Sequence, residues 1–240
     1  MKALIMAIGP LLFLLFACGA ESPQQEEEAE STTQSIWESL SYQQPISLFG
    51  AELELAEFSD TAWRLEEGVL SAYHDEFIWT QREYDNFRLE LEFKNAAGTN
   101  SGVIFYCSDK ADWVPNSLEV QIADDYAEKW AAGEAFARSG AIYGHQPATP
   151  EIVKAAGEWN QLVVEAQDQL IRVSLNGEVV NEFNMAEFTS GTVNPDGSAV
   201  PPWLPNPPAG MPTKGYLGFQ GKHGDAPIHF RNVRIAEATK

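Results

Sequence analysis

Positive charge is scarce in this sequence. Its 240 residues include 15 Lys and Arg against 35 Asp and Glu, which gives a formal net charge of −20 at pH 7. A protein that binds free nucleic acid needs a basic surface to neutralise phosphates, and this chain has the opposite sign. We therefore expect no nucleic-acid partner.

Cysteine is scarcer still, with only Cys18 and Cys107. Two cysteines exclude a disulfide framework and a zinc site built from several thiolates. Cys107 continues an apolar run that reads as a strand, so we expect a buried, unreactive thiol. Phosphate-binding glycine loops and serine nucleophile elbows are also missing, which argues against the enzyme classes that depend on them.

The sequence has one long apolar run, from Ala3 to Ala17, and the charged residue Lys2 precedes it directly. A membrane-spanning helix needs about 20 residues, so residues 1–17 are predicted to be a secretory leader. Leu15 stands three positions before Cys18 and a small residue precedes Cys18 directly, which resembles a bacterial lipobox. The resemblance implies cleavage before Cys18 and lipidation of its thiol. The alternative is an ordinary leader with an incidental cysteine.

Lipidation of Cys18 would attach the chain to a membrane through the lipid anchor only. No Asp directly follows Cys18, which favours the outer membrane, with the protein facing the periplasm or the cell surface. Residues 18–35 are rich in Glu, Gln, Ser and Thr and lack apolar periodicity, so they predict an acidic flexible tether. Subtracting Lys2 and the five Glu of the tether leaves residues 36–240 with 14 basic and 30 acidic groups, a net charge of −16.

Residues 36–240 are predicted to form one all-β domain. The chain is 44% hydrophobic and 11% aromatic, which excludes a disordered protein. Apolar and polar residues alternate with period two in many short segments, whereas no long amphipathic helical pattern occurs. The predicted strands are 87–93, 103–107, 118–122, 162–164, 171–175, 178–183, 216–220 and 228–235. Many short strands separated by Gly and Pro turns favour a sandwich of two antiparallel sheets.

Turn and loop signals fit this sandwich. Asn176-Gly177 predicts a tight hairpin because both positions tolerate positive φ. Residues 126–136 are rich in Ala and Glu and are expected to form a short helix on a loop. Residues 191–212 hold most of the proline-rich material, and we expect them to be a rigid insertion that shapes a rim.

The strand at 118–122 is the most informative for function. Leu118, Val120 and Ile122 would face the core, so Glu119 and Gln121 would project together from the other face, about 7 Å apart. A carboxylate and an amide that point the same way suit the hydroxyls of a sugar. The alternative is a solvated polar face.

Ordinary glycosidases need two carboxylates that flank the scissile bond. Here the position two residues after Glu119 is Gln121, which cannot ionise, so that chemistry is disfavoured. His223 lies on a glycine-flanked turn and could exchange a proton near neutral pH, or it could be only a hydrogen-bonding loop residue. His145 is a second loop candidate, and His74 and His229 are expected to be structural.

Short motifs along the chain together resemble the 3-keto-disaccharide hydrolase domain family. In order, they are Trp63-Arg64-Leu65-Glu66-Glu67-Gly68-Val69-Leu70, Ile78-Trp79-Thr80, Asn100-Ser101-Gly102-Val103, Leu118-Glu119-Val120-Gln121-Ile122, Gly140-Ala141-Ile142-Tyr143, Gly157-Glu158-Trp159-Asn160, Gly218-Phe219-Gln220, His223-Gly224 and Phe230-Arg231-Asn232-Val233-Arg234-Ile235. The similarity covers about residues 48–235. It implies a concanavalin A-like jelly roll with a sugar site on the concave sheet.

The resemblance also implies a chemistry that needs no second carboxylate. A ketone at C3 of a glycoside acidifies the C2 proton, so a base can remove it, the C1 substituent leaves, and water adds to the product. We expect Glu119 and His223 to be the base and the acid, in either order. The candidate substrate-binding residues are Asn100, Gln121, Asp124, Trp130, Tyr143, Lys154 and Trp159. A divalent metal ion held by Glu119, Asp124 and His223 is a further possibility.

Two other functions fit the same residues. Jelly rolls also serve as carbohydrate-binding or adhesion modules without catalysis, and the seven Trp, several of them on predicted loops, suit that role. A structural role in a surface complex, with the acidic exterior providing only solubility, is the third hypothesis.

Overall fold

The computed structural model of the chain describes residues 36–239. The predicted leader 1–17, the lipidation site Cys18 and the tether 18–35 lie outside the described residues. Among the described residues, the compact unit that begins at Ser41 carries the fold. Within the described part, no helix is long and apolar enough to cross a membrane.

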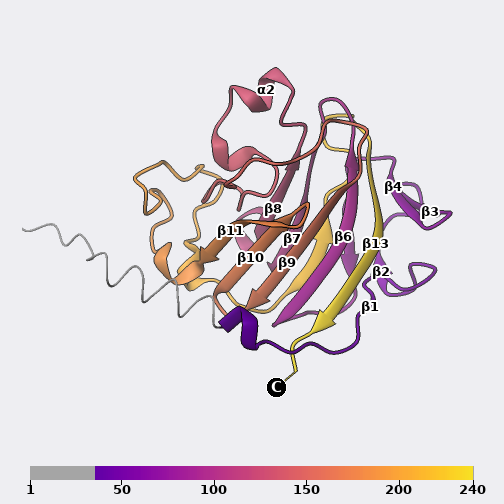
Figure 1. Ribbon diagram of the computed structural model, residues 1–240, viewed down its shortest axis with the longest axis horizontal. Coiled ribbons are helices and arrows are strands. Elements are labelled where there is room, and N and C mark those ends of the chain that lie inside the picture. The colour runs from indigo at the N-terminus through magenta and orange to yellow at the C-terminus, as the bar shows by residue number, and fades with distance from the viewer. Residues whose placement is uncertain (1–35, 240) are drawn as a thin grey trace, which may run out of the picture. The chain divides into compact units, whose positions relative to one another are not determined.

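Two antiparallel sheets form this unit, as the alternation predicted (Figure 1). The first sheet has eight strands in the order β11-β10-β9-β6-β13-β4-β3, and β1 pairs with β13 outside this path. Their bounds are β1 Ile46–Ser47, β3 Trp63–Glu66, β4 Val69–Ala72, β6 Phe87–Asn95, β9 Asn160–Gln167, β10 Leu170–Leu175, β11 Glu178–Asn184 and β13 Ile228–Glu237.

The second sheet has five strands in the order β2-β5-β12-β7-β8. Their bounds are β2 Ala56–Glu57, β5 Ile78–Thr80, β7 Asn100–Cys107, β8 Leu118–Ala123 and β12 Tyr216–Phe219. Strand β7 begins at Asn100, whereas the sequence predicted a turn up to Gly102, because Asn100 and Gly102 pair with Ala123 and Gln121 of β8. Cys107 is a free, fully buried thiol in this strand, as predicted.

Aromatic side chains join the two sheets. Phe219 of β12 and Phe230 of β13 are fully buried, with ring centroids 4.7 Å apart. Phe49 meets Phe219 edge-on, and Trp63 lies against Phe230. Burial of such large rings supplies the main favourable free energy of folding.

The turns follow the predicted signals. Asn176 and Gly177 have φ of 52° and 90°, and they join β10 to β11 as a two-residue hairpin. The 126–136 segment contains helix α2, Glu128–Ala131, followed by a 3₁₀ turn at Ala135–Ala137. A further 3₁₀ turn, η1, spans Val114–Asn116 before β8. The insertion 191–212 contains no strand and only one 3₁₀ turn, Pro208–Gly210.

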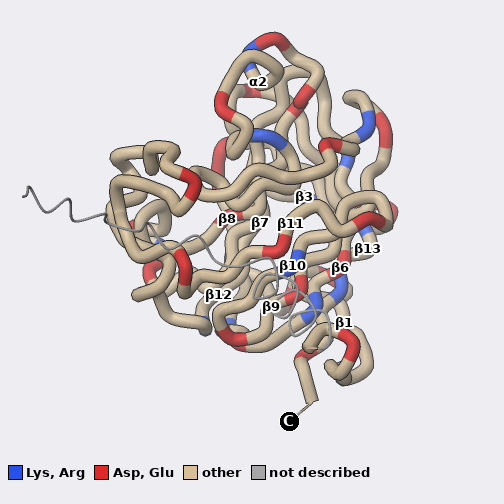
Figure 2. The backbone as a smooth tube through the Cα atoms, turned by 60° about the vertical axis from the view of Figure 1, so that its left-hand side comes forward, with Lys and Arg blue, Asp and Glu red and all other residues tan. Residues whose placement is uncertain are grey.

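Acidic residues are spread over the loops and strand ends of the described unit (Figure 2). The outer face of the eight-stranded sheet pairs its basic residues: Arg88 with Glu165, Arg172 with Glu182 and Arg231 with Glu92, at 2.6 to 2.8 Å. These pairs are partly exposed, and ion pairs open to solvent contribute modestly to stability. They do neutralise much of the positive charge, so the surface is left acidic.

Candidate active site

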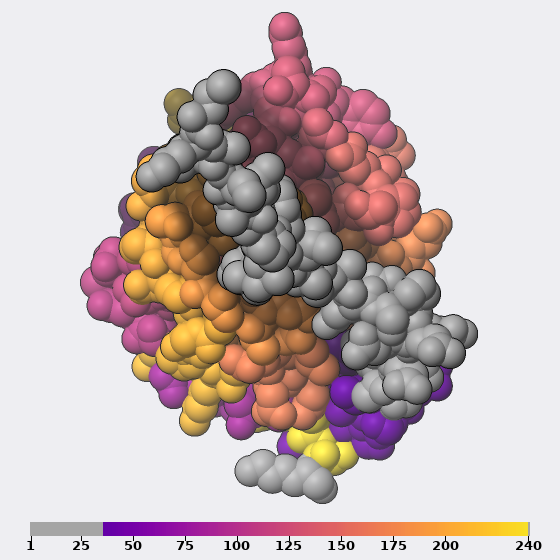
Figure 3. Space-filling model, turned by 90° about the vertical axis from the view of Figure 1, so that its left-hand side faces the viewer, coloured from indigo at the N-terminus to yellow at the C-terminus, as the bar shows by residue number. Residues whose placement is uncertain are grey.

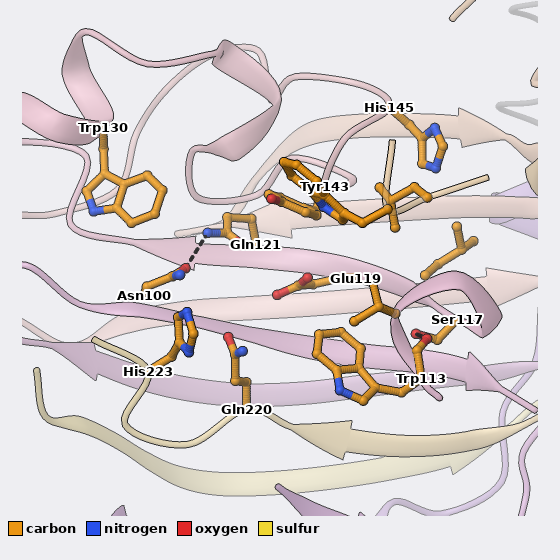
Figure 4. Close-up of a pocket in the computed structure, with 14 residues that line it drawn as sticks. Asn100, Trp113, Ser117, Glu119, Gln121, Trp130, Tyr143, His145, Gln220 and His223 are labelled. Carbon is orange, nitrogen blue, oxygen red and sulfur yellow. Dashed lines mark hydrogen bonds between the residues drawn. The ribbon is translucent and has the colours of Figure 1, made fainter. Parts of the chain in front are cut away.

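A cavity of about 240 Å³ lies on the outer face of the five-stranded sheet (Figure 4). Strands β7 and β8 form its floor, and the segments around residue 130 and around residue 200 stand on the same side of the molecule (Figure 3). Its polar lining residues are Asn100, Ser117, Glu119, Gln121, His145, Gln220 and His223. Its apolar and aromatic lining residues are Trp113, Val114, Leu118, Trp130, Tyr143, Trp203 and Leu204.

Glu119 lies on the floor of the cavity, as the alternation of β8 predicted. Val120 and Ile122 are fully buried in the core, so Glu119 and Gln121 face the opposite side. Among the described residues, none donates a hydrogen bond or forms an ion pair to the Glu119 carboxyl. Burial raises the pKa of Glu119 to about 8, because nothing compensates the charged form. The carboxyl is therefore mostly protonated at neutral pH.

Gly102 leaves the space that the Glu119 carboxyl occupies. A Cβ atom added at Gly102 would overlap the Glu119 carboxyl oxygen. The residue before it, Ser101, is buried and donates a hydrogen bond to Gln220 O at 2.8 Å, so the backbone here cannot easily move aside. Gly102 does not have a positive φ, so its backbone conformation does not require a glycine. A glycine is needed because the Glu119 side chain on the paired strand fills the space that a Cβ atom would take.

We predict that Gly102→Ala lowers the activity of the site about 10-fold or more while the fold remains stable. The methyl group displaces the Glu119 carboxyl, and small misplacements of reacting groups carry large rate penalties. Steady-state kinetics and thermal unfolding of the variant test this. Gly210→Ala is a control for backbone change, because Gly210 has no positive φ and a Cβ there meets no atom within 4 Å. An active Gly102→Ala variant would contradict the prediction.

Gln121 and Asn100 form an amide pair beside Glu119. Gln121 is 2% exposed, and its Nε2 donates a hydrogen bond to Asn100 Oδ1 at 2.8 Å (Figure 4). This bond directs the Asn100 Nδ2 group away from Gln121. No described residue accepts a hydrogen bond from Asn100 Nδ2, so its N–H groups are available to an oxygen in the cavity.

His223 is held next to Asn100 by an isolated β-bridge between the two backbones. Its Nδ1 lies 2.7 Å from Asp75 Oδ2. Asp75 reaches this position because Lys222 N donates to His74 O at 2.9 Å, and Gly221 sits against the backbone of residues 74–76 without room for a Cβ. A proton on Nδ1 shared with Asp75 leaves Nε2 with its lone pair free.

Tyr143 approaches Glu119 from the opposite side. Its backbone N–H donates to Glu119 O at 2.9 Å. Burial, followed by the negative charge of Glu119, raises the pKa of Tyr143, and a side-chain hydrogen bond with Trp203 acts in the other direction. Tyr143 therefore stays a neutral phenol that links the cavity floor to the insertion.

The insertion 191–212 is fixed to the sandwich through buried polar contacts. Asn194 is 3% exposed, and its Nδ2 donates to Gly144 O at 3.1 Å. Its Oδ1 lies 3.2 Å from His145 Nδ1. Burial lowers the pKa of His145, so His145 is neutral at pH 7 and can donate this bond. Leu204 packs against Gly144, where a Cβ would collide with it.

We predict that Asn194→Ala destabilises the protein by about 1–3 kcal/mol, because Gly144 O and His145 Nδ1 lose a buried partner. Denaturant unfolding measures the change. Thr189→Ala, at an exposed position near the start of the insertion, should change the free energy of unfolding by less than about 0.5 kcal/mol. Equal effects of the two substitutions would show that the insertion is not anchored at Asn194.

Comparison with known proteins places this geometry in a family. The 3-keto-alpha-glucoside-1,2-lyase-like domain matches residues 44–236. The chain belongs to this family. A 3-keto-disaccharide hydrolase of Bacteroides thetaiotaomicron is 25% identical over 172 residues, which cover 64% of this chain. The aligned part spans 59% of that relative's own length.

Solved structures support the same assignment. A Parabacteroides distasonis protein provisionally named a glycosyl hydrolase is 52% identical, with a TM-score of 0.79, over 80% of this chain and 98% of its own. A second protein of that organism with the same provisional name is 25% identical, with a TM-score of 0.63, over 80% of this chain and 92% of its own. A galectin-like protein of Bacillus subtilis, 12% identical with a TM-score of 0.54 over 83% of this chain and 97% of its own, shares the fold alone.

These likenesses agree with the predicted concanavalin A-like jelly roll. Six of the residues predicted for the family site line one cavity. They are Asn100, Glu119, Gln121, Trp130, Tyr143 and His223. The pattern of the sequence alone had left open whether these residues meet.

Three predicted site residues of this family member do not line the cavity, and the prediction that they bind substrate there is corrected. Asp124 is 5% exposed, and its Oδ2 accepts a hydrogen bond from Gly98 N at 2.8 Å. Lys154 Nζ donates to Trp159 O at 3.0 Å. Trp159 precedes β9 in the other sheet, where its ring lies 4.1 Å from the Arg231 guanidinium carbon and 5.0 Å from Lys94 Nζ.

The predicted metal-ligand set is not assembled either. In the part of the chain that the structure describes, no three His, Cys, Asp or Glu side chains group as metal ligands. Asp124 is directed to the Gly98 amide and does not line the cavity, so it does not complete a ligand set with Glu119 and His223.

Several residues of the site were not predicted from the sequence. Asp75 pairs with His223, and Gln220, Trp113, Trp203 and Leu204 line the cavity. Trp203 and Leu204 lie within the proline-rich insertion, which was predicted to shape a rim. Their position in the sequence could therefore have indicated that they line the site. No sequence pattern could indicate Asp75, because it lies 148 residues from His223 in the sequence.

Proposed function

We propose that this chain cleaves 3-keto-glycosides by removal of the C2 proton, elimination of the C1 substituent and addition of water. The family and the named relatives support a sugar substrate and bond cleavage. The cavity supplies one carboxyl, one histidine paired with a carboxylate, and free amide donors. These groups suit elimination better than ordinary glycoside hydrolysis, which needs two carboxyls about the bond.

His223 is the base of the first step. Asp75 holds its Nδ1, so Nε2 takes the C2 proton. The electron pair left at C2 delocalises onto the C3 oxygen as an enolate. The N–H groups of Asn100, oriented through Gln121, stabilise the charge that develops on this oxygen.

Glu119 is the acid of the second step. The enolate returns its electron pair, a double bond forms between C1 and C2, and the bond from C1 to the leaving oxygen breaks. Glu119 gives its proton to that oxygen, which requires a carboxyl that is protonated near neutral pH. Loss of an alkoxide without a proton would be far slower.

Hydration reverses both proton transfers. Glu119, now a carboxylate, takes a proton from the water that attacks C1, and the His223 imidazolium returns a proton to C2. The products are the free alcohol and the 3-keto sugar, and both side chains regain their starting protonation. Exchange between the two roles is typical of paired acid and base groups.

The observation that carries this proposal is the partnerless Glu119 carboxyl in one cavity with the His223–Asp75 pair. A 3-keto-disaccharide deuterated at C2 tests it. We expect release of free sugar, a primary isotope effect on that release, and solvent hydrogen at C2 of the product. Absence of turnover over a panel of 3-keto-glycosides, or turnover with neither a primary isotope effect nor exchange at C2, would reject the mechanism. An isotope effect without exchange would show that His223 returns the same hydrogen to C2.

A non-catalytic carbohydrate-binding module is the second candidate. It is favoured by the aromatic lining, since Trp113, Trp130, Tyr143 and Trp203 offer flat apolar faces to a sugar ring. This function predicts glycan binding without turnover that persists in Glu119→Gln and is lost in Trp130→Ala. Calorimetry of the two variants with the same sugars separates it from the enzyme.

A further inference from the structure

The two ends of the cavity differ in chemistry. On one side of Glu119 lie Asn100, Gln121, Gln220 and His223, which present amides and an imidazole (Figure 4). Trp113 lies on the other side, with Ser117 behind it (Figure 4). We call the region lined by Trp113, Val114, Leu118, Trp203 and Leu204 the apolar end.

Two walls enclose the apolar end. Trp113 and Val114, at the start of η1, form one wall, and Trp203 and Leu204 of the insertion form the other. Asn206 Nδ2 donates to Pro115 O at 2.8 Å and joins the two walls. The apolar end is thus built by two segments about 90 residues apart in sequence that are fixed to each other.

Both walls are supported from behind. The Trp113 ring lies 4.7 Å from Phe77, which stacks on Trp79 at 5.0 Å, so Trp113 belongs to an aromatic cluster outside the main core. On the other wall, Leu204 is 8% exposed and packs against Gly144. Trp203 is hydrogen-bonded to Tyr143 yet remains 54% exposed, so a large part of its ring is uncovered beside the cavity.

We infer that the leaving group of the preferred substrate is apolar, an aromatic or alicyclic alcohol, and that it binds in the apolar end between Trp113 and Trp203. This inference rests on the function proposed above. The oxygens of the 3-keto sugar need donors and acceptors, which the amides and the imidazole on one side of Glu119 supply. At the other end, Ser117 Oγ already donates to Trp113 O and His145 Nδ1 is paired with Asn194 Oδ1. Glu119 lies between the two regions, where the acid for the leaving oxygen must stand. A second sugar in the apolar end could stack on Trp113 or Trp203 but would find few partners for its hydroxyls, and such losses are severe.

The test compares two 3-keto-glucosides, one of benzyl alcohol and one of 2-methoxyethanol. Both leave as primary alcohols, and they differ mainly in apolar surface. We expect kcat/KM to favour the benzyl compound by about 10- to 100-fold, the range that burial of one aromatic ring gives. In Trp203→Ala the preference should fall several-fold. Trp159→Ala is the matched control, because Trp159 precedes β9 of the other sheet and does not line the cavity, and it should keep the preference unchanged.

Binding measurements keep the inference separate from the proposed chemistry. Calorimetry with benzyl and 2-methoxyethyl glucosides, which carry no ketone, reports on the apolar end whether or not the chain is an enzyme. Tighter binding of the benzyl glucoside, weakened in Trp203→Ala, supports the apolar end even if no 3-keto-glycoside reacts. Equal kcat/KM and equal binding of the two compounds, or a preference for 2-methoxyethyl, would overturn the inference.

Discussion

Replacing Glu119 with Gln is expected to lower kcat/KM on 3-keto-glycosides by about 10²–10⁴-fold, the range of a general acid or base. The amide matches the carboxyl in shape but has no acidic proton for the leaving oxygen. Glu66→Gln is the matched control, because Glu66 is an exposed residue of β3 in the other sheet. Retention of wild-type turnover by Glu119→Gln would remove Glu119 from the mechanism.

The same substitution should stabilise the fold above neutral pH. The folded-state pKa of Glu119, about 8, exceeds the ordinary value of 4.5. The native state therefore holds a proton that the unfolded state releases between these values, so stability falls as pH rises from 4.5 to 8. The Glu119→Gln variant has no ionisable group at this position, so its free energy of unfolding does not fall for this reason over that pH range. Unfolding at pH 9 should show a gain of a few kcal/mol, at about 1.4 kcal/mol per pKa unit, which should vanish near pH 4.

The pH dependence of kcat/KM should also report the ionisation of Glu119. Because the proposed acid must carry its proton, kcat/KM should decline as pH rises through about 8. An activity that instead rises through this range would show that Glu119 acts as the base in the first step. The pH profile thus decides between the two orders of roles that the sequence left open.

Replacing His223 with Asn is expected to lower kcat by about 10²–10⁴-fold, because the C2 proton then has no acceptor. His74→Asn is the control, since His74 is exposed and does not line the cavity. Loss of solvent exchange at C2 should accompany the loss of turnover. A His223→Asn variant that still exchanges C2 would assign the base elsewhere.

Asp75 is a positioning residue in this scheme, and its substitution should act through His223. Asp75→Asn keeps a hydrogen bond to Nδ1 but removes the charge, so we expect a smaller fall in kcat, about 10-fold, with KM nearly unchanged. The pH profile should shift on its low-pH side, which a purely structural defect would not cause. An unaltered profile would contradict this role.

The sequence predicted those parts of the fold that depend on local pattern. Alternation in β6, β8 and β10 gave strands and the face of each side chain, and Asn176-Gly177 gave its hairpin. Glu119 and Gln121 were placed together for the same reason. His223 was found because glycines flank it, although its neighbour Asn100 is 123 residues away in sequence.

The incorrect site predictions concern residues whose position in space depends on which sheet the neighbouring strand joins. Trp159 stands in a motif as characteristic as that of Glu119, yet β9 belongs to the eight-stranded sheet, so its ring packs between basic side chains. Asp124 directly follows β8, and its carboxylate accepts a hydrogen bond from Gly98 N in the neighbouring turn. Alternation gives the face of a strand but not its neighbours, and Asp75 and Trp203 could be found only from tertiary contacts.

The insertion 191–212 has a consequence for how related proteins diverge. It meets the sandwich mainly at Gly144, His145 and Pro115, and none of the groups assigned to proton transfer belongs to it. Its sequence can therefore change while Glu119, His223 and Asn100 keep their positions. With the leaving group bound against Trp203 as inferred above, exchange of this one segment would change the leaving-group preference and keep the groups that transfer protons.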